Sequence, residues 1–203
     1  MQVKKEVNKV YTIAKELKRH GTFTAFGAAT GIIIMAIIVF GDVPPKISYT
    51  LFYILHPIHV ILSALVTTAI YKLYTRGKLW VAILIGYTGS IGIATLSDAI
   101  IPYIGAHLLG ISIPFIIPFI AKWWISLLAF IGIIIGYLEP TTKFPHAGHV
   151  LLSTWASLFH ITQYQITIAD WMFPVIFLFL FLAVWIPCCT SDIVYPLLFI
   201  RKD

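Results

Sequence analysis

Charged residues are scarce in this 203-residue chain. Asp, Glu, Lys and Arg together make up 11% of the sequence, whereas hydrophobic residues make up 60%. A soluble domain carries roughly 25% charged residues, so this shortage excludes an ordinary globular protein. Several apolar runs are about as long as a membrane is thick, and we therefore predict an integral membrane protein.

Cysteine is also rare. The chain has two cysteines, and they are adjacent, at Cys188 and Cys189. Vicinal cysteines seldom pair because the resulting geometry is strained, so no disulfide framework is expected.

Acidic residues number 8 against 14 Lys and Arg. The basic residues gather between apolar runs, which is typical of membrane topology, and no nucleic-acid partner is expected.

The expected fold class is all-α, a polytopic integral membrane helical bundle with six transmembrane helices. A hydrocarbon core of roughly 30 Å needs about 20 helical residues to cross it. No soluble second domain and no internal repeat are expected, and no motif identifies a family. The predicted spans are 22–40, 49–71, 79–103, 122–138, 150–168 and 172–186.

Two further segments are expected outside these spans. Residues 1–20 are basic, and apolar residues recur in them at alternating gaps of four and three. This pattern predicts a cytoplasmic amphipathic helix on the lipid surface, separate from a single bundle at 21–203. A short oligomerising coil is the alternative. Residues 105–121 are apolar but broken by glycines and prolines, which predicts a re-entrant or interfacial segment.

The basic residues also predict the orientation of the bundle. The N-terminal 20 residues hold six of them, 72–78 three, 139–149 one and 201–203 two, so twelve of the fourteen lie on one side of a six-span topology. Basic residues concentrate on the cytoplasmic side of membrane proteins. We therefore predict a cell-membrane protein with both termini in the cytoplasm.

A polar stripe runs through the second predicted span. His56 and His59 are three residues apart and share one helix face, which Ser63 and Thr67 continue at intervals of four. Ionisable side chains at membrane depth are costly, and they usually serve a function. We interpret Ser63 and Thr67 as a path that leads inward from the two histidines.

Two other spans place ionisable residues at the depth of these histidines, counted at 1.5 Å per helical residue. Imidazole and carboxylate are the usual ligands of zinc and similar metals. Histidines that only hydrogen-bond a neighbouring helix are the alternative. The predicted divalent transition-metal site, with zinc as the favoured ion, consists of His56, His59, Asp98 and His160.

A second set of potential ligands lies at the predicted cytoplasmic face. It combines imidazole, carboxylate and thiol groups, which would suit a soft or borderline metal. Ordinary helix caps and two inert buried cysteines are the alternative. The members of this set are Glu139, His146, His149, Cys188, Cys189 and Asp192.

Three functions fit these patterns. Transport of a divalent transition metal is favoured, because two ligand sets lie at opposite faces with a polar stripe between them. An intramembrane zinc-dependent hydrolase acting on a lipid is the second, with a zinc-activated water at the outer site. A non-catalytic subunit of a larger membrane complex is the third. The expected partners are the lipid bilayer and a metal ion, with a homo-oligomer or complex partners left open.

Overall fold

The computed structural model describes residues 9–75, 78–140, 143–164 and 166–199. Helices make up most of this part of the chain, and no strand occurs in it. The all-helical fold class is therefore confirmed.

Within these described residues, four helical segments are long and apolar enough to cross a membrane: His20–Phe40, Pro45–Tyr74, Leu79–Leu108 and Met172–Leu198. The first belongs to α1 (Lys9–Phe40), and the second is α2 (Pro45–Tyr74). The other two each continue through a short π-helix. The third comprises α3 (Leu79–Thr95), η1 (Leu96–Ile100) and α4 (Ile101–Leu108), and the fourth comprises α8 (Met172–Cys189), η2 (Thr190–Val194) and α9 (Tyr195–Leu198).

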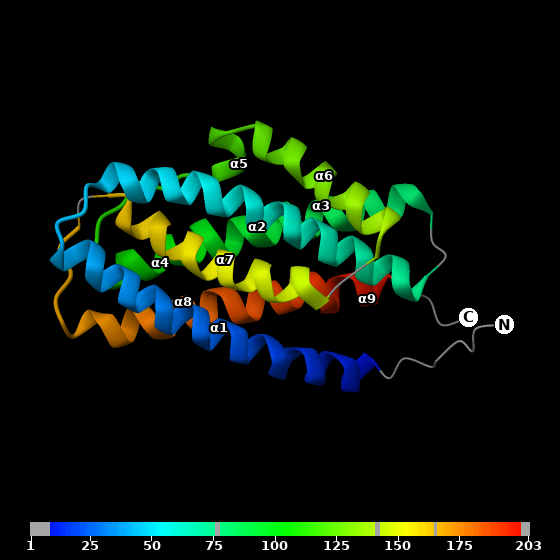
Figure 1. Cartoon of the computed structure of the whole chain (residues 1–203), viewed down its shortest axis with the longest axis horizontal. Helices are drawn as coiled ribbons and strands as arrows, with labels where there is room; N and C mark the ends of the chain where they lie inside the picture. Colours follow the sequence, from blue (N-terminus) through cyan, green and yellow to red (C-terminus); the bar gives the residue numbers. More distant parts are fainter. Residues whose placement is uncertain (1–8, 76–77, 141–142, 165, 200–203) are drawn as a thin grey trace.

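Three helices lie between these long segments: α5 (Pro118–Ala121), α6 (Trp124–Leu138) and α7 (Lys143–Thr162). The 15 residues of α6 extend over only about 22 Å. The 20 residues of α7 are long enough to cross a hydrocarbon core, but they include polar side chains. The count of six spans therefore stays a prediction. Successive long helices do alternate in direction, and α1 begins at the end of the bundle where α9 finishes (Figure 1).

Several helix boundaries differ from the predicted spans. α1 is continuous from Lys9, without a break between the basic segment and the first span. The third helical segment extends to Leu108. Two residues later, Gly110 adopts a left-handed φ of 75°, a conformation that commonly ends a helix. Residues 109–117 after it are not helical. α7 ends at Thr162, six residues before the predicted end, and the next two residues, Gln163 and Tyr164, are not helical. The membrane placement of 105–121 stays a prediction.

Helix α2 packs closely against α6 along the glycines of a GxxxG pair. A Cβ atom added at Gly132 would collide with the carbonyl oxygen of Ile61, and one at Gly136 with that of Leu65. The two backbones can approach this closely only because both positions lack a side chain. This packing places α2 inside the bundle, between α6 on one side and α7 on the other (Figure 1).

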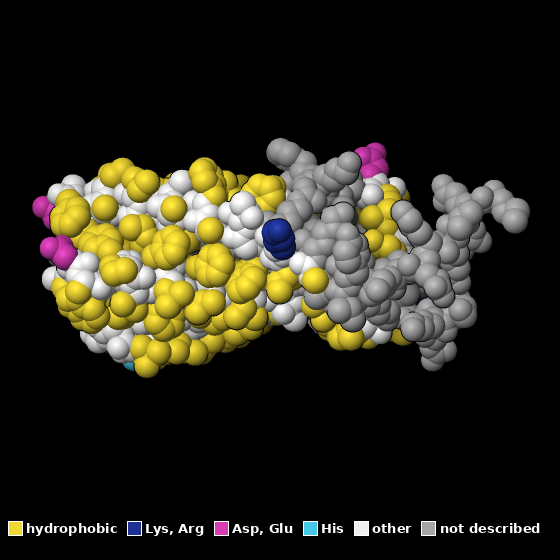
Figure 2. Space-filling model, turned by 90° about the horizontal axis from the view of Figure 1, so that it is seen from below, with side chains coloured by type: hydrophobic (Ala, Val, Ile, Leu, Met, Phe, Trp, Pro, Cys, Tyr) yellow, Lys and Arg dark blue, Asp and Glu magenta, His cyan; other side chains and the backbone are white. Residues whose placement is uncertain are grey.

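The outer surface of the bundle is apolar. Figure 2 shows a face covered largely by hydrophobic side chains, with acidic residues confined to its ends. Exposed hydrophobic residues on this scale are rare in soluble monomers and fit a lipid environment. Polar side chains are instead buried between α2, α7 and the two π-helices, among them Ser63, Asp98, His149 and Asp192.

Candidate metal centre

Asp98 lies in the π-helix η1, which is followed closely by a proline. Pro102 has no backbone N–H, so it cannot bond the carbonyl of Asp98 four residues earlier. The N–H of the preceding residue, Ile101, bonds five residues back to the carbonyl of Leu96, which is the π-helical pattern. Single π-turns inside α-helices are frequent at functional sites. Here the π-turn carries a fully buried carboxylate.

Four side chains donate hydrogen bonds to Asp98. The Nδ1 atoms of His56 and His59 lie 2.8 and 2.7 Å from Oδ2. The hydroxyls of Ser97 and Ser153 each lie 2.7 Å from Oδ1. We call these residues the Asp98 cluster. All are buried, so they interact without competition from water, and each imidazole keeps its Nε2 atom directed away from the carboxylate.

His160 lies beside this cluster. The Phe52 ring contacts the imidazoles of both His56 and His160, with ring centroids 5.3 and 5.1 Å away. The amide of Gln163 lies 3.2 Å from Nδ1 of His160. Nε2 of His160 is buried and has no hydrogen-bond partner among the described residues. An unsatisfied buried nitrogen of this kind fits a ligand position.

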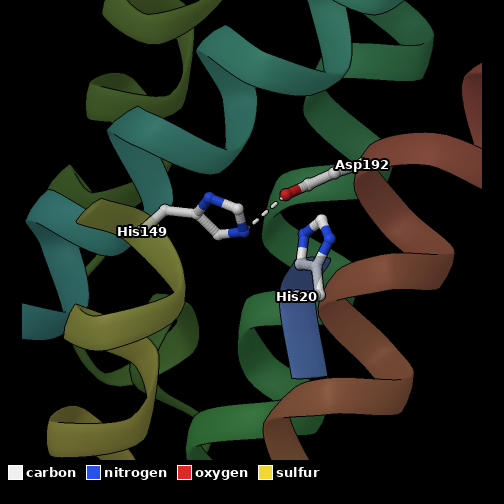
Figure 3. Close-up of side chains that lie close together, drawn as sticks. All are labelled: His20, His149 and Asp192. Atoms are coloured by element: carbon white, nitrogen blue, oxygen red, sulfur yellow. Dashed lines mark ion pairs between the residues drawn. The ribbon is translucent and has the colours of Figure 1, made fainter. Parts of the chain in front are cut away.

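A second buried carboxylate, Asp192, lies in η2. The hydroxyls of Ser63 and Thr67 donate to its Oδ1 atom, each over 3.1 Å. Nε2 of His149 lies 2.5 Å from Oδ2. His20 of α1 completes this group, as Figure 3 shows, and its ring meets that of His149 edge-on at 5.9 Å. We call these five residues the Asp192 cluster.

Apart from His20, the residues of the two clusters belong to two motifs, each of which occurs twice in the sequence. His-x2-His-x3-Ser-x3-(Ser/Thr) occurs at 56–67 in α2 and at 146–157 in α7. Ser-Asp-x3-Pro occurs at 97–102 and at 191–196, where Pro196 again follows a π-turn. The expectation of no internal repeat was therefore wrong, because the repeated residues are a few polar positions within otherwise dissimilar apolar helices.

The two halves of the repeat run in opposite directions, and each half donates a hydrogen bond to the carboxylate of the other. α2 and α7 are antiparallel in Figure 1, as are the segments that carry η1 and η2. Ser153 of α7 donates to Asp98, and the corresponding Ser63 of α2 donates to Asp192. The corresponding histidines His59 and His149 stack with ring centroids 5.8 Å apart and planes 13° apart. These contacts describe an inverted repeat with the two clusters on either side of its centre.

The structure brings together only part of the predicted second set. His149 and Asp192 meet, and Ser63 and Thr67 bind this carboxylate. Glu139 is exposed at the end of α6, and Cys189 packs in an apolar cluster with Leu65 and Ile70. Cys188 instead faces the Asp98 cluster, with its sulfur 3.9 Å from Nε2 of His59. The side chain of His146 lies outside the described residues.

His20 is the member of the Asp192 cluster that sequence reasoning missed. It follows the basic stretch of α1, where it reads as one more polar residue of a surface helix. In the structure its side chain is 1% exposed. The signal available in the sequence was its position, because His20 immediately precedes the first apolar run and so can enter the bundle.

Both clusters have the chemistry of a metal site. In each of the sets His56, His59, Asp98 and His20, His149, Asp192, one ligand atom per residue lies within 4.8 Å of the others. Neutral imidazole and carboxylate bind zinc and similar divalent ions. A cation would also offset the cost of burying a carboxylate in an apolar bundle. The metal identity and the role of each residue as a ligand stay predictions.

Comparisons with known protein families, with curated proteins and with solved structures find no match to this chain.

Proposed function

We propose that this protein transports a divalent transition-metal ion across a membrane, with the Asp98 and Asp192 clusters as successive binding sites. The observation that carries this proposal is the reciprocal inverted repeat, in which a serine hydroxyl of each half donates a hydrogen bond to the carboxylate of the other. Many transporters are built from inverted repeats and bind their substrate where the repeats meet.

The polar stripe of α2 supports a path between the two clusters. His56 and His59 bind Asp98, and Ser63 and Thr67 bind Asp192 farther along the same helix. Eleven residues separate His56 from Thr67, about 16 Å along the helix axis. Multi-site paths of this kind allow an ion to enter and to leave, because no single site has to bind it very tightly.

The hydrolase alternative needs a cleft that admits a lipid and presents polar groups to it. A pocket between α4, α7 and α8 is lined by apolar residues, among them Pro102, Ala106, Ile176 and Leu180. Neither carboxylate and none of the clustered histidines lines it. This pocket therefore gives the hydrolase no specific support.

The direct test is metal flux in proteoliposomes that contain the purified full-length chain and a trapped zinc-sensitive dye. We expect a zinc gradient to drive dye response with wild-type protein and His59→Ala to reduce it to background, since His59 joins the Asp98 cluster and stacks on His149. His107→Ala is the matched control, because His107 is exposed on α4. Absence of zinc, cadmium, manganese and cobalt flux in wild-type liposomes would refute transport.

We further propose that the chain crosses the membrane six times with both termini in the cytoplasm. The bias of the basic residues supports this topology, as do the alternating helix directions. In a variant lacking both native cysteines, an impermeant thiol reagent added outside cells should label a cysteine at Asp42 or Asp170. It should spare one at Arg76 or Lys143. The reverse pattern would invert the orientation.

A further inference from the structure

Cys188 occupies the junction between the two clusters. Its sulfur lies 3.9 Å from Nε2 of His59 and 3.7 Å from the hydroxyl of Ser153. Both neighbours also bind Asp98, while the His59 ring stacks on His149 of the Asp192 cluster. Cys188 is 1% exposed. The thiol therefore lies between two groups of the candidate metal centre and the apolar residues Val150 and Val184.

The contact with Asp98 directs the other ring nitrogen of His59, Nε2, toward this thiol. Nδ1 of His59 lies 2.7 Å from the carboxylate, which is a hydrogen-bond distance. This distance is shorter than the separation of about 3.3 Å that two ligand atoms of one tetrahedral zinc would have, at zinc–nitrogen and zinc–oxygen distances of about 2.0–2.1 Å. The two atoms are therefore hydrogen-bonded to each other rather than joined through one metal ion. Histidine ligands commonly donate their other nitrogen to a carboxylate, which fixes the ring and leaves the opposite nitrogen for the metal. Asp98 holds His59 in this way.

The separation between Nε2 of His59 and the sulfur of Cys188 is close to that of two ligands on one metal. With zinc–nitrogen and zinc–sulfur distances of about 2.0 and 2.3 Å, a tetrahedral ion would place the two atoms about 3.5 Å apart. The observed 3.9 Å exceeds this by a margin that a small side-chain rotation removes.

We propose that Cys188 is a metal ligand together with Nε2 of His59, and that its thiolate makes this protein selective for soft or borderline divalent ions of the zinc and cadmium class. This inference rests on the proposed metal transport and names the class of ion that it carries. Metal binding replaces the thiol proton, which is released to the solution. Thiolate disfavours magnesium and manganese, which prefer oxygen ligands.

The adjacent cysteine supplies a matched control. Cys189 is equally buried and packs in a different apolar cluster, which contains Leu65, Val66 and Ile193. The chain has two cysteines, so a Cys189→Ser variant retains Cys188 as its single thiol. A thiolate signal in this variant can therefore be assigned to Cys188 without altering Cys188 itself.

The test is cobalt titration of the purified full-length protein in detergent, followed by absorption spectroscopy. Wild type and Cys189→Ser should both show thiolate-to-cobalt charge-transfer absorption in the near ultraviolet. Cys188→Ser and Cys188→Ala should lose it while keeping the visible cobalt bands. Cadmium affinity should fall by about tenfold or more in both Cys188 variants, because losing even a group that only supports a ligand weakens metal binding about 10–100-fold, and manganese affinity should not change.

The possible failures separate the two proposals. If wild type and Cys189→Ser bind cobalt without charge-transfer absorption, Cys188 is not a ligand, whereas a metal centre of imidazole and carboxylate remains. If wild type binds no cobalt, zinc or cadmium at all, the inference and the proposed transport both fail. Should the Cys188 variants not fold, the spectrum of Cys189→Ser alone decides the question.

Discussion

Among the side chains that the structure describes, the two carboxylates of the inverted repeat receive their histidines from different helices. Asp98 receives both of its imidazoles from α2, since His56 and His59 share one helix face. Asp192 receives His149 from α7, and its second histidine, His20, comes from α1. α1 has no counterpart in the repeated motif.

The described parts of the two clusters therefore depend on different helices. The Asp98 cluster closes entirely with helices that belong to the repeat, so its geometry depends on α2, η1 and α7. The Asp192 cluster also depends on how α1 packs against α7. Four predictions test this comparison, in decreasing order of expected effect.

Removing either carboxylate charge should have the largest effect. We expect Asp98→Asn and Asp192→Asn each to abolish zinc flux and to lower the free energy of unfolding by about 3 kcal/mol or more, because buried donors lose their charged acceptor. Flux in proteoliposomes and thermal unfolding in detergent measure the two quantities. Asp170→Asn, in an exposed turn, is the control. Full flux in one of the cluster variants would mean that its cluster lies outside the transport path.

The histidines should separate the two clusters. His56→Ala and His20→Ala should each weaken zinc binding by about 10–100-fold at one cluster and leave the other unchanged, because each removes one candidate ligand. Zinc titration calorimetry should then resolve one altered and one unaltered site. An equal change at both sites after His20→Ala would contradict separate clusters, and His107→Ala should change neither.

The exchanged hydroxyls test whether the halves are reciprocal. Ser63→Ala and Ser153→Ala should each lower the free energy of unfolding by about 1–3 kcal/mol, because one hydrogen bond to a buried charged group is lost. The two effects should add, since the serines serve different carboxylates. Thermal unfolding of both single variants and the double variant measures this. Ser112→Ala, at an exposed site, should have no measurable effect.

The prolines that follow the π-turns should have the smallest effect. Pro102→Ala and Pro196→Ala each restore a backbone N–H four residues after the carboxylate, which allows an ordinary α-helical bond and turns the aspartate away from its partners. We expect zinc affinity to fall severalfold, by about 1 kcal/mol of binding free energy. Zinc titration of each variant measures the change. Unaltered affinity in both variants would show that the π-turns do not depend on proline.

The sequence by itself indicated a helical chain with apolar helices long enough to cross a membrane, because charged residues are few and the apolar runs are long. It also indicated that His56, His59 and Asp98 are related, since depth along a helix follows from residue number at a fixed rise. The cost of burying such groups in an apolar bundle marked them as candidates before any contact was known.

Only the tertiary structure decided which residues meet across helices. The rotation of each helix about its axis determines whether a side chain faces a neighbour or lipid, and an apolar sequence with few polar positions specifies this rotation weakly. The hydrogen bonds of Ser63 and Thr67 to Asp192, the placement of His20 near that carboxylate, and the position of Cys188 beside His59 depend on that rotation. The repeated motif was present in the sequence. The hydrogen bonds that Ser63 and Ser153 donate to the carboxylate of the opposite half exist only once the antiparallel helices have packed.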